Sequence, residues 1–243
     1  MKKVVVFLPA YNEEDCIVEM IQTIPRTMSP DVEVKIIVID DGSKDKTVEL
    51  ANRAGVDAVY QNETNQGLGA AVRQGFQRCL ELGADIGVMI DADLEYPGRQ
   101  IPDVIQPILD GKADYVMGSR FLGTIEGMKV HRRLGNYAFT LLQSILLKRW
   151  IHDGQSGMRA FSKEVLQEAE IIHDYNYAQV VTLNIVRKGF RMIEIPIHYQ
   201  VRKKGESFIK FKAYMSSVLP AIYREMRRKP IPFTKSQGNE EWT

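Results

Sequence analysis

Short runs of β-branched and aliphatic residues alternate with segments of helical periodicity over the first half of this chain. The expected strands cover residues 4–8, 34–39, 57–60, 86–90 and 114–117. The expected helices cover residues 13–24, 68–82 and 101–109, and another helix follows "DDGSKDKT". Strands and helices that alternate at these lengths build parallel βαβ units, with helices on both faces of one sheet. The pattern therefore predicts an α/β fold with a mostly parallel sheet.

The second half of the chain loses this regular alternation after Gly118. Helices are expected over residues 133–150, 177–188 and 211–228, and a strand over residues 193–199. The first of these helices has a narrow polar stripe and a wide apolar face. No segment reads as a linker between domains. We expect a catalytic domain over residues 1–208, an amphipathic helical segment over 209–230 and a tail over 231–243.

Charge is divided unevenly along the chain, although the net charge is only +1. Residues 1–128 carry 12 Lys and Arg against 21 Asp and Glu, a net charge of −9, whereas residues 129–243 carry 20 against 10, a net charge of +10. A basic half of this kind predicts an anionic partner, such as phosphate, nucleic acid or a lipid surface.

Other features of the whole sequence bear on the cellular compartment in which the protein is expected. Cys16 and Cys79 lie in segments of helical pattern, and we expect buried, reduced thiols. The apolar start at residues 4–8 is too short for a signal peptide. No run of 18 apolar residues predicts a transmembrane helix.

Three polar motifs stand where expected strands end: "PAYNEE", "DDGS" and "DADLE". In open parallel sheets, ligands bind in the crevice at the carboxyl ends of the strands. We therefore expect the three motifs to share one crevice.

The motif "DADLE" places Asp91, Asp93 and Glu95 directly after an apolar run. Carboxylates crowded in this way repel one another unless a cation lies between them. Mg²⁺ typically takes one or two protein carboxylates and completes its shell with water and phosphate oxygens. The motif predicts a divalent metal site, and the alternative is a solvated acidic loop.

Asp40 and Asp41 end another expected strand, before Ser43 and a helix. Their carboxylates suit the N–H groups of a nucleobase or the hydroxyls of a ribose, and the alternative is helix capping. Nearby, "NQGLGAAVRQG" departs from the dinucleotide fingerprint, because Val72 stands where a third glycine is due. Gly67 and Gly69 are read as a glycine loop that opens a helix, with a substrate close to it as the other possibility.

Several arginines accompany glycine-containing loops of the basic half: Arg120, Arg132, Arg133 and Arg202. Guanidinium groups bind phosphate oxygens through two parallel hydrogen bonds, so the group predicts an anion site, with a solvated surface as the alternative. No nucleophile elbow, Walker A loop or zinc-ligand pairing of histidines is present. Basic residues are not interleaved with aromatic ones, which argues against a nucleic-acid surface.

Seven motifs occur in a fixed order over residues 4–208: "PAYNEE", "DDGSKDKT", "NQGLGAAVRQG", "DADLEYP", "GSRF", "DGQSGMRAF" and "IEIPIHYQVRKKGES". Together they resemble the family 2 glycosyltransferases with the GT-A fold, which is Rossmann-like, and most closely the dolichyl- or polyprenyl-phosphate mannose and glucose synthases. The resemblance implies an inverting transfer of a hexose from a UDP- or GDP-sugar to a polyprenyl or dolichyl monophosphate. It also implies Mg²⁺ or Mn²⁺ and a place at the cytoplasmic face of a membrane.

The resemblance further implies roles for individual residues. Nucleoside positions match Pro9, Tyr11, Glu13 and Asp40. Metal and diphosphate positions match Asp91, Asp93 and Glu95. Acceptor-phosphate positions match Arg120, Arg132 and Arg202. Asp153 is read as a general base, as a ligand of donor sugar hydroxyls or as part of a structural turn. Departures from this branch occur at Glu95, where a neutral residue is frequent, at Phe208, where lysine is frequent, and in "YNYAQ".

The last expected helix carries an apolar stripe between basic ends, as in helices that lie on anionic membranes. The alternative is that this stripe packs on the protein's own core or on a second copy in a homo-oligomer. Two other functions also stay open: a glycosyltransferase with a soluble acceptor, such as a sugar or phosphoglycerate, and a non-catalytic nucleotide-sugar-binding or membrane-adaptor protein.

Overall fold

A seven-stranded sheet forms the centre of the part of the chain that the computed structural model describes, residues 1–174, 177–202 and 211–233, with the backbone alone described for 211–216. The strands are β1 (Lys2–Ala10), β2 (Val32–Asp40), β3 (Ala58–Gln61), β4 (Ile86–Ile90), β5 (Tyr115–Glu126), β6 (Met158–Ser162) and β7 (Met192–Gln200). Their order is β3-β2-β1-β4-β6-β5-β7. Only β6 among them runs antiparallel to its neighbours, which confirms the expected α/β fold.

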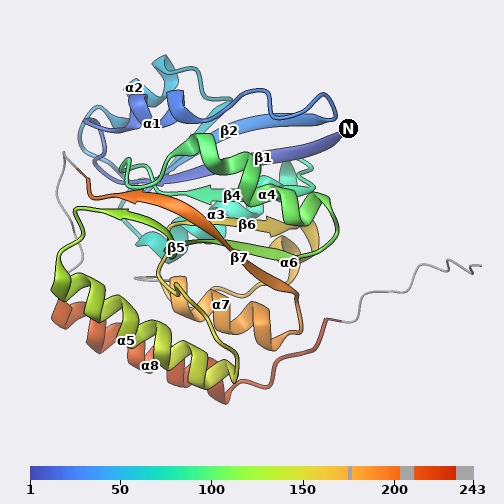
Figure 1. The fold of residues 1–243 in the computed structure, drawn as a ribbon. Coiled ribbons are helices and arrows are strands. Elements are labelled where there is room, and N and C mark those ends of the chain that lie inside the picture. The colour runs from blue at the N-terminus through green and yellow to red at the C-terminus, as the bar shows by residue number, and fades with distance from the viewer. Residues whose placement is uncertain (175–176, 203–210, 234–243) are drawn as a thin grey trace, which may run out of the picture.

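Helices cover both faces of this sheet (Figure 1). One face carries α1 (Ile17–Thr23), α2 (Thr47–Arg53), the 3₁₀ helix η1 (Gly98–Gln100) and α4 (Ile101–Leu109). The other face carries α3 (Leu68–Glu81), α6 (Lys163–Glu168) and α7 (Ala178–Arg187). Each face buries its own hydrophobic core, so the central strands are apolar on both sides. That double burial explains why β1, β2 and β4 read as continuous apolar runs.

Two further helices, α5 (Val130–Leu147) and α8 (Phe211–Arg227), lie side by side next to α7 (Figure 1). A third apolar cluster joins them, with Leu183 of α7 packed against Val218 and Ile222 of α8 and against partly buried residues of α5. In the described part of the chain, no helix has the length and apolarity needed to cross a membrane.

Several elements differ from the sequence-based expectation. Strand β6 and helix α6 were not expected, because buried Arg159 interrupts the apolar run of "MRAFS". Strand β5 continues well beyond Met117, and its pairing with β7 shifts register between Ser119 and Thr124. The expected boundary at residue 208 and the last ten residues of the expected tail lie outside the described residues. Both cysteines are buried free thiols, as expected.

Candidate active site

The loops that follow β1 and β2 are tied together by hydrogen bonds. The Asn12 amide donates to Ser43 Oγ at 2.9 Å, and the Lys44 amide donates back to Asn12 Oδ1 at 2.9 Å. The Glu13 amide donates to Thr47 Oγ1 at 2.8 Å. Because β1 and β2 are parallel neighbours, their carboxyl ends meet at one edge of the sheet, and these bonds fix both loops there.

Asp40 and Asp41 have different surroundings at the end of β2. Asp40 is fully buried, and its Oδ2 accepts the Ser43 amide at 3.1 Å. Its Oδ1 is also buried and has no hydrogen-bond partner among the described residues. The Asp41 carboxylate instead accepts the Asn62 side chain and the Gln66 and Gly67 amides at 2.7–3.0 Å. The unpaired oxygen of Asp40 is therefore the one that suits an incoming donor.

The two glycines of the α3 loop serve the packing of the chain itself. Gly67 has a φ of 98°, which favours glycine, and a Cβ on Gly69 would lie 1.9 Å from the His173 carbonyl oxygen. The Gly69 amide also donates to the Asp174 carbonyl at 2.6 Å. These contacts account for both glycines as a loop that opens a helix, and the nearby substrate stays a prediction.

An acidic cluster lies at the carboxyl ends of β1 and β4. Its members are Glu13, Asp91, Asp93 and Glu95. Arg202, which follows β7, reaches into the cluster, where Nη2 donates to Asp93 Oδ2 and Nη1 lies 3.7 Å from Glu13. Its Nε is 4.0 Å from Glu95. The structure thus brings together the acidic residues of two predicted motifs and one of the predicted arginines.

The resolved pKa shifts within this cluster reflect burial first and neighbouring carboxylates second. Burial raises the pKa of Glu13 to about 7, with Arg202 opposing the rise and Asp93 adding to it. The pKa of Asp91 lies well above its ordinary value, because the protein desolvates it and because Asp93 and Glu95 are close. Desolvation and Asp93 also raise the pKa of Glu95. Ionisation of Glu13, Asp91 and Glu95 is therefore unfavourable, although Arg202 lowers the pKa of each.

The loop before β6 covers Asp91. The Asp91 amide donates to the Gly157 carbonyl at 3.3 Å, and a Cβ on Gly157 would lie 1.8 Å from Asp91 Oδ2. Arg159 is fully buried and supports this loop. Its Nε donates to the Ser156 carbonyl of the loop at 2.8 Å, and its Nη1 donates to the Tyr115 hydroxyl at 2.7 Å. Glycine at 157 therefore lets the loop approach the carboxylate.

Arg120 and Asp153 form a buried ion pair. Arg120 Nε donates to Asp153 Oδ2 at 2.7 Å and Nη2 to Oδ1 at 2.8 Å, with exposed fractions of 5% and 0% for the two side chains. The Arg120 amide also donates to Asp153 Oδ2 at 3.0 Å. Burial opposes ionisation of Asp153, but Arg120 outweighs it, and the pKa of Asp153 lies below its ordinary value. Of the three readings of Asp153, this geometry favours the structural turn.

The remaining predicted residues lie around this centre. Arg132 lies 3.9 Å from Glu95, and the Arg133 guanidinium lies over the rings of Phe121 and Tyr137, at 6.0 and 5.9 Å. Pro9 is buried in β1 and pairs with Ile39 of β2, and Tyr11 follows β1 and is partly buried. Arg132 therefore adds a second positive charge beside the acidic cluster, whereas Arg133 lies over aromatic rings.

The donor atoms of the acidic cluster suit a hard divalent cation. All are carboxylate oxygens, and a cation would favour the ionised forms of Asp91 and Glu95, whose pKa values are raised by burial and by neighbouring carboxylates. Across the residues that the structure describes, however, no three His, Cys, Asp or Glu side chains are arranged to ligate a metal by themselves. The metal site at Asp91 and Asp93 therefore stays a prediction, and a cation held there would complete its shell with water or phosphate oxygens.

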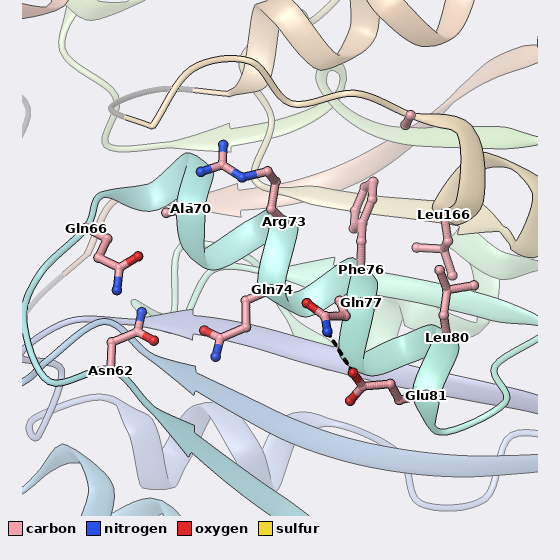
Figure 2. Close-up of a pocket in the computed structure, with 11 residues that line it drawn as sticks. Asn62, Gln66, Ala70, Arg73, Gln74, Phe76, Gln77, Leu80, Glu81 and Leu166 are labelled. Atoms are coloured by element: carbon pink, nitrogen blue, oxygen red, sulfur yellow. Dashed lines mark hydrogen bonds between the residues drawn. The ribbon is translucent and has the colours of Figure 1, made fainter.

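A cavity of about 590 Å³ lies elsewhere, along α3 (Figure 2). Its lining includes the amides of Asn62, Gln66, Gln74 and Gln77, the last bonded to Glu81 at 2.8 Å. None of the four acidic-cluster residues lines it. We therefore take the acidic cluster as the candidate site, because the charged residues of the predicted motifs meet there.

Sequence reasoning missed two supports of this site. Arg159 and Gly157 lie within "DGQSGMRAF", a motif for which the sequence indicated no role beyond that of Asp153. Glu194 of β7 accepts the amides of His152 and Asp153 at 2.8–3.0 Å and so anchors the start of the same loop. No local pattern in the sequence signals Glu194, because its partners are about 40 residues away.

Comparison with known proteins gives a consistent family match. Residues 5–169 match the family described as Glycosyl transferase family 2. The UDP-N-acetylglucosamine–dolichyl-phosphate N-acetylglucosaminyltransferase of Methanococcus voltae is 33% identical over 239 residues, which cover 88% of this chain and 94% of that protein. The dolichol-phosphate mannosyltransferase of Pyrococcus furiosus is 32% identical over 232 residues, which cover 93% of this chain but 64% of that protein.

Solved structures share the fold at lower sequence identity. Glucosyl-3-phosphoglycerate synthase from Mycobacterium tuberculosis, in complex with Mn²⁺, UDP and phosphoglyceric acid, matches with a TM-score of 0.74 and 22% identity. The match covers 96% of this chain and 80% of that chain. At this level of identity, the likeness establishes the arrangement of the sheet and its helices alone.

Proposed function

The chain belongs to glycosyl transferase family 2, and on that basis we propose that it transfers a hexose from a nucleotide-diphosphate sugar to a polyprenyl or dolichyl monophosphate. The observation that carries the proposal is one edge of the sheet, where Asp40 has an unpaired oxygen at the end of β2 and the acidic cluster at the ends of β1 and β4 binds Arg202. The relatives from M. voltae and P. furiosus, which are named as enzymes acting on dolichyl or dolichol phosphate, support this acceptor class.

The nucleoside and the diphosphate of a nucleotide sugar both have suitable partners at this edge. We assign the nucleoside to the β1 and β2 ends, where Asp40 Oδ1 would accept an N–H of the base or a hydroxyl of the ribose, with Pro9, Tyr11 and Glu13 around it. We assign the diphosphate to the β4 end, near Asp91 and Asp93. Mg²⁺ or Mn²⁺, when held there, would neutralise the negative charge that develops on the leaving diphosphate.

The acceptor phosphate supplies its own nucleophile. A phosphate monoester has a second pKa of about 6 and is therefore largely ionised at neutral pH. Its oxygen forms the new bond to the anomeric carbon, while the bond from that carbon to the diphosphate breaks and its electron pair leaves with the nucleoside diphosphate. No proton has to be removed from the acceptor, so the residues near it need only position the phosphate and balance its charge.

Arg132 and Arg202 are the arginines that we propose for this, because they lie beside the acidic cluster with side chains that are 41% and 18% exposed. Arg120 is less suited to it, since Asp153 already binds two nitrogens of its guanidinium. We therefore propose Arg120 and Asp153 as a pair that shapes the site, and Arg132 and Arg202 as the phosphate contacts.

A partition assay tests the acceptor. Purified protein is incubated with a radiolabelled UDP- or GDP-sugar, Mn²⁺ and either undecaprenyl phosphate or 3-phosphoglycerate, and the label is followed into butanol or water. A thermal-shift screen of UDP, GDP and their sugars selects the donor beforehand. We expect label in butanol only with the lipid phosphate. Label on 3-phosphoglycerate would favour the soluble-acceptor enzyme, and nucleotide binding without any turnover would favour a non-catalytic binding protein.

A lipid acceptor requires a surface that meets the bilayer, and we propose that α5 provides it. Five apolar side chains of α5 are 43–73% exposed: Val130, Leu134, Tyr137, Leu141 and Ile145. They recur at intervals of three or four residues and so form one stripe. We call this set the α5 stripe.

The polar side of α5 faces inward, which explains why the α5 stripe faces outward. Buried Gln143 donates to the Gln179 carbonyl at 3.1 Å, Thr140 Oγ1 accepts the Gly154 amide at 3.0 Å and Ser144 Oγ accepts the Ile151 amide at 3.0 Å. These bonds anchor the loop that carries Asp153. The helix thus uses its polar residues to hold the active-site loop and leaves apolar residues for a partner.

Charge around the α5 stripe suits anionic lipid head groups. Exposed basic residues lie at both ends of α5, on the neighbouring α8 and directly after it: Lys129, Arg132, Arg133, Lys148, Arg149, Arg224, Arg227 and Arg228. Exposed Leu219 and Tyr223 of α8 add apolar surface, whereas Val218 and Ile222 pack on α7 and α5. The expected amphipathic α8 thus packs on the protein on one side, and the membrane role of its exposed side is a proposal.

Flotation with vesicles that contain anionic phosphatidylglycerol tests the α5 stripe. We expect the wild type to float at low salt and less at high salt. The double variant Leu141→Asp, Ile145→Asp should stay at the bottom, whereas Asn52→Asp, on an exposed position of α2, should float like the wild type. Equal flotation of the double variant would refute the assignment, and a concentration-dependent dimer that the double variant abolishes would instead assign the stripe to a second copy.

A further inference from the structure

Arg202 holds the centre of the acidic cluster with a single guanidinium. It bonds to Asp93 and lies within 4.0 Å of Glu13 and Glu95. Its side chain is 18% exposed, and those of its three acidic partners are 8–11% exposed, so water screens these charges only in part. The guanidinium therefore supplies the positive charge that a cluster of carboxylates requires.

The position that Arg202 takes is also the one where a divalent cation would be expected. Asp93 belongs to the carboxylates suited to Mg²⁺ or Mn²⁺, and its Oδ2 is the oxygen that accepts the Arg202 bond. A carboxylate oxygen cannot bind a guanidinium and a metal ion at close range without bringing two cations together, and like charges at that distance repel. Occupation of Asp93 by one cation therefore disfavours the other.

From this competition we infer that Arg202 is the resident counter-cation of the acidic cluster and that a divalent cation displaces it. The catalytic consequence rests on the proposed function: the displaced guanidinium becomes available to the acceptor phosphate once cation and donor are in place. Donor binding thereby prepares acceptor binding, because one arginine serves the two sites in turn. By linkage, removing Arg202 must strengthen cation binding.

The test measures cation binding in the absence of any transfer. Mn²⁺ alone is titrated into the full-length protein at about pH 8, above the pKa of about 7 at Glu13, and the free hexaaquo ion is followed by its EPR signal. Arg202→Gln removes the competing charge, and Arg202→Lys keeps a charge without the planar fork. Arg53→Gln is the matched control, since it removes one positive charge from an exposed pair with Glu49 on α2.

We expect Arg202→Gln to bind Mn²⁺ at least about tenfold more tightly than the wild type, since hydrogen bonds to charged groups contribute on that scale. Arg202→Lys should lie between the two, and Arg53→Gln should match the wild type. The inference is overturned if Arg202→Gln binds Mn²⁺ no better than the wild type, including the case in which neither protein takes up Mn²⁺. A wrong acceptor assignment would show separately, as missing lipid product in the partition assay with the Mn²⁺ result intact.

Discussion

The buried pair of Arg120 and Asp153 allows a sharp test of whether these two residues shape the site or perform chemistry in it. The perturbation is a double-mutant cycle of Arg120→Met, Asp153→Asn and the two combined. Met keeps the length and apolar character of the arginine stem. Asn keeps one acceptor oxygen, whereas the Arg120 amide bonds to Asp153 Oδ2 and the Gln155 amide to Asp153 Oδ1, both at 3.0 Å. Each single change therefore removes one charge, and Asp153→Asn also loses one of these two backbone hydrogen bonds.

The expected magnitude follows from the burial of the pair. With side chains 5% and 0% exposed, loss of either partner leaves the other charge in a medium that solvates it poorly. Breaking a buried pair from one side costs about 3–5 kcal/mol in the free energy of unfolding, whereas replacing both charges together costs much less. For a chain of this size, about 1 kcal/mol lowers Tm by roughly 2–4 °C, so each single variant should melt roughly 6–20 °C lower.

Equilibrium unfolding in urea, followed by far-UV circular dichroism, gives the free energies, provided that unfolding is reversible. We expect the combined variant to lose at least about 2 kcal/mol less than the sum of the two single losses. Single variants within about 1 kcal/mol of the wild type, or losses that simply add, would refute the structural role. In that case, Arg120 would again be a candidate contact of the acceptor phosphate, and Asp153 a candidate general base.

Two further predictions concern the acidic cluster. Because Glu13 keeps its proton up to a pH of about 7 in the fold but only to about 4.5 in the unfolded chain, stability should fall as pH rises between these values. Glu13→Gln should remove that loss of stability, worth at most about 3 kcal/mol. The free energy of unfolding in urea is measured at several pH values for both proteins, and the same pH dependence in the variant and the wild type would contradict the prediction. Gly157→Ala should lower transfer at least about tenfold, because its Cβ would meet Asp91 Oδ2 at 1.8 Å. Gly135→Ala, with nothing within 4 Å, is its kinetic control, and equal rates for the two would argue against this contact.

Much of the fold was predictable because its signals are local. The apolar runs of β1, β2 and β4 are buried on both faces, so each reads as a strand without knowledge of its partners. Their parallel arrangement then brings the motifs at their ends together, as expected. Strand β6 was missed because Arg159 lies within it. The buried guanidinium is satisfied by carbonyls of the preceding loop and of Ala178 and by the hydroxyls of Tyr115 and Thr182.

The candidate site was predictable in its residue types and less so in its pairings. The acidic residues of "DADLE" and "PAYNEE" were expected near one another, but nothing local shows that Arg202, more than 100 residues later, lies between them. Likewise, the pairing of Arg120 with Asp153 depends on how the loop before β6 packs against Arg120, which lies within β5. The polar stripe of α5 gave no local sign that it would face inward, since its partners are carbonyls and amides of other segments.

The transfer rate of variants in the acidic cluster tests the central claim most directly, namely that the carboxylates at the end of β4 hold the diphosphate end of a nucleotide sugar for transfer to a lipid phosphate. The measurement is the initial rate of lipid-linked sugar formation with Mn²⁺, for the wild type, Asp91→Asn, Asp93→Asn and the control Asp103→Asn on the exposed side of α4. Both cluster variants should be slower by at least about 100-fold, since loss of charge stabilisation at a leaving group costs on this scale. Asp103→Asn should match the wild type. Wild-type rates in Asp91→Asn and Asp93→Asn, with the fold intact by circular dichroism, would contradict the account.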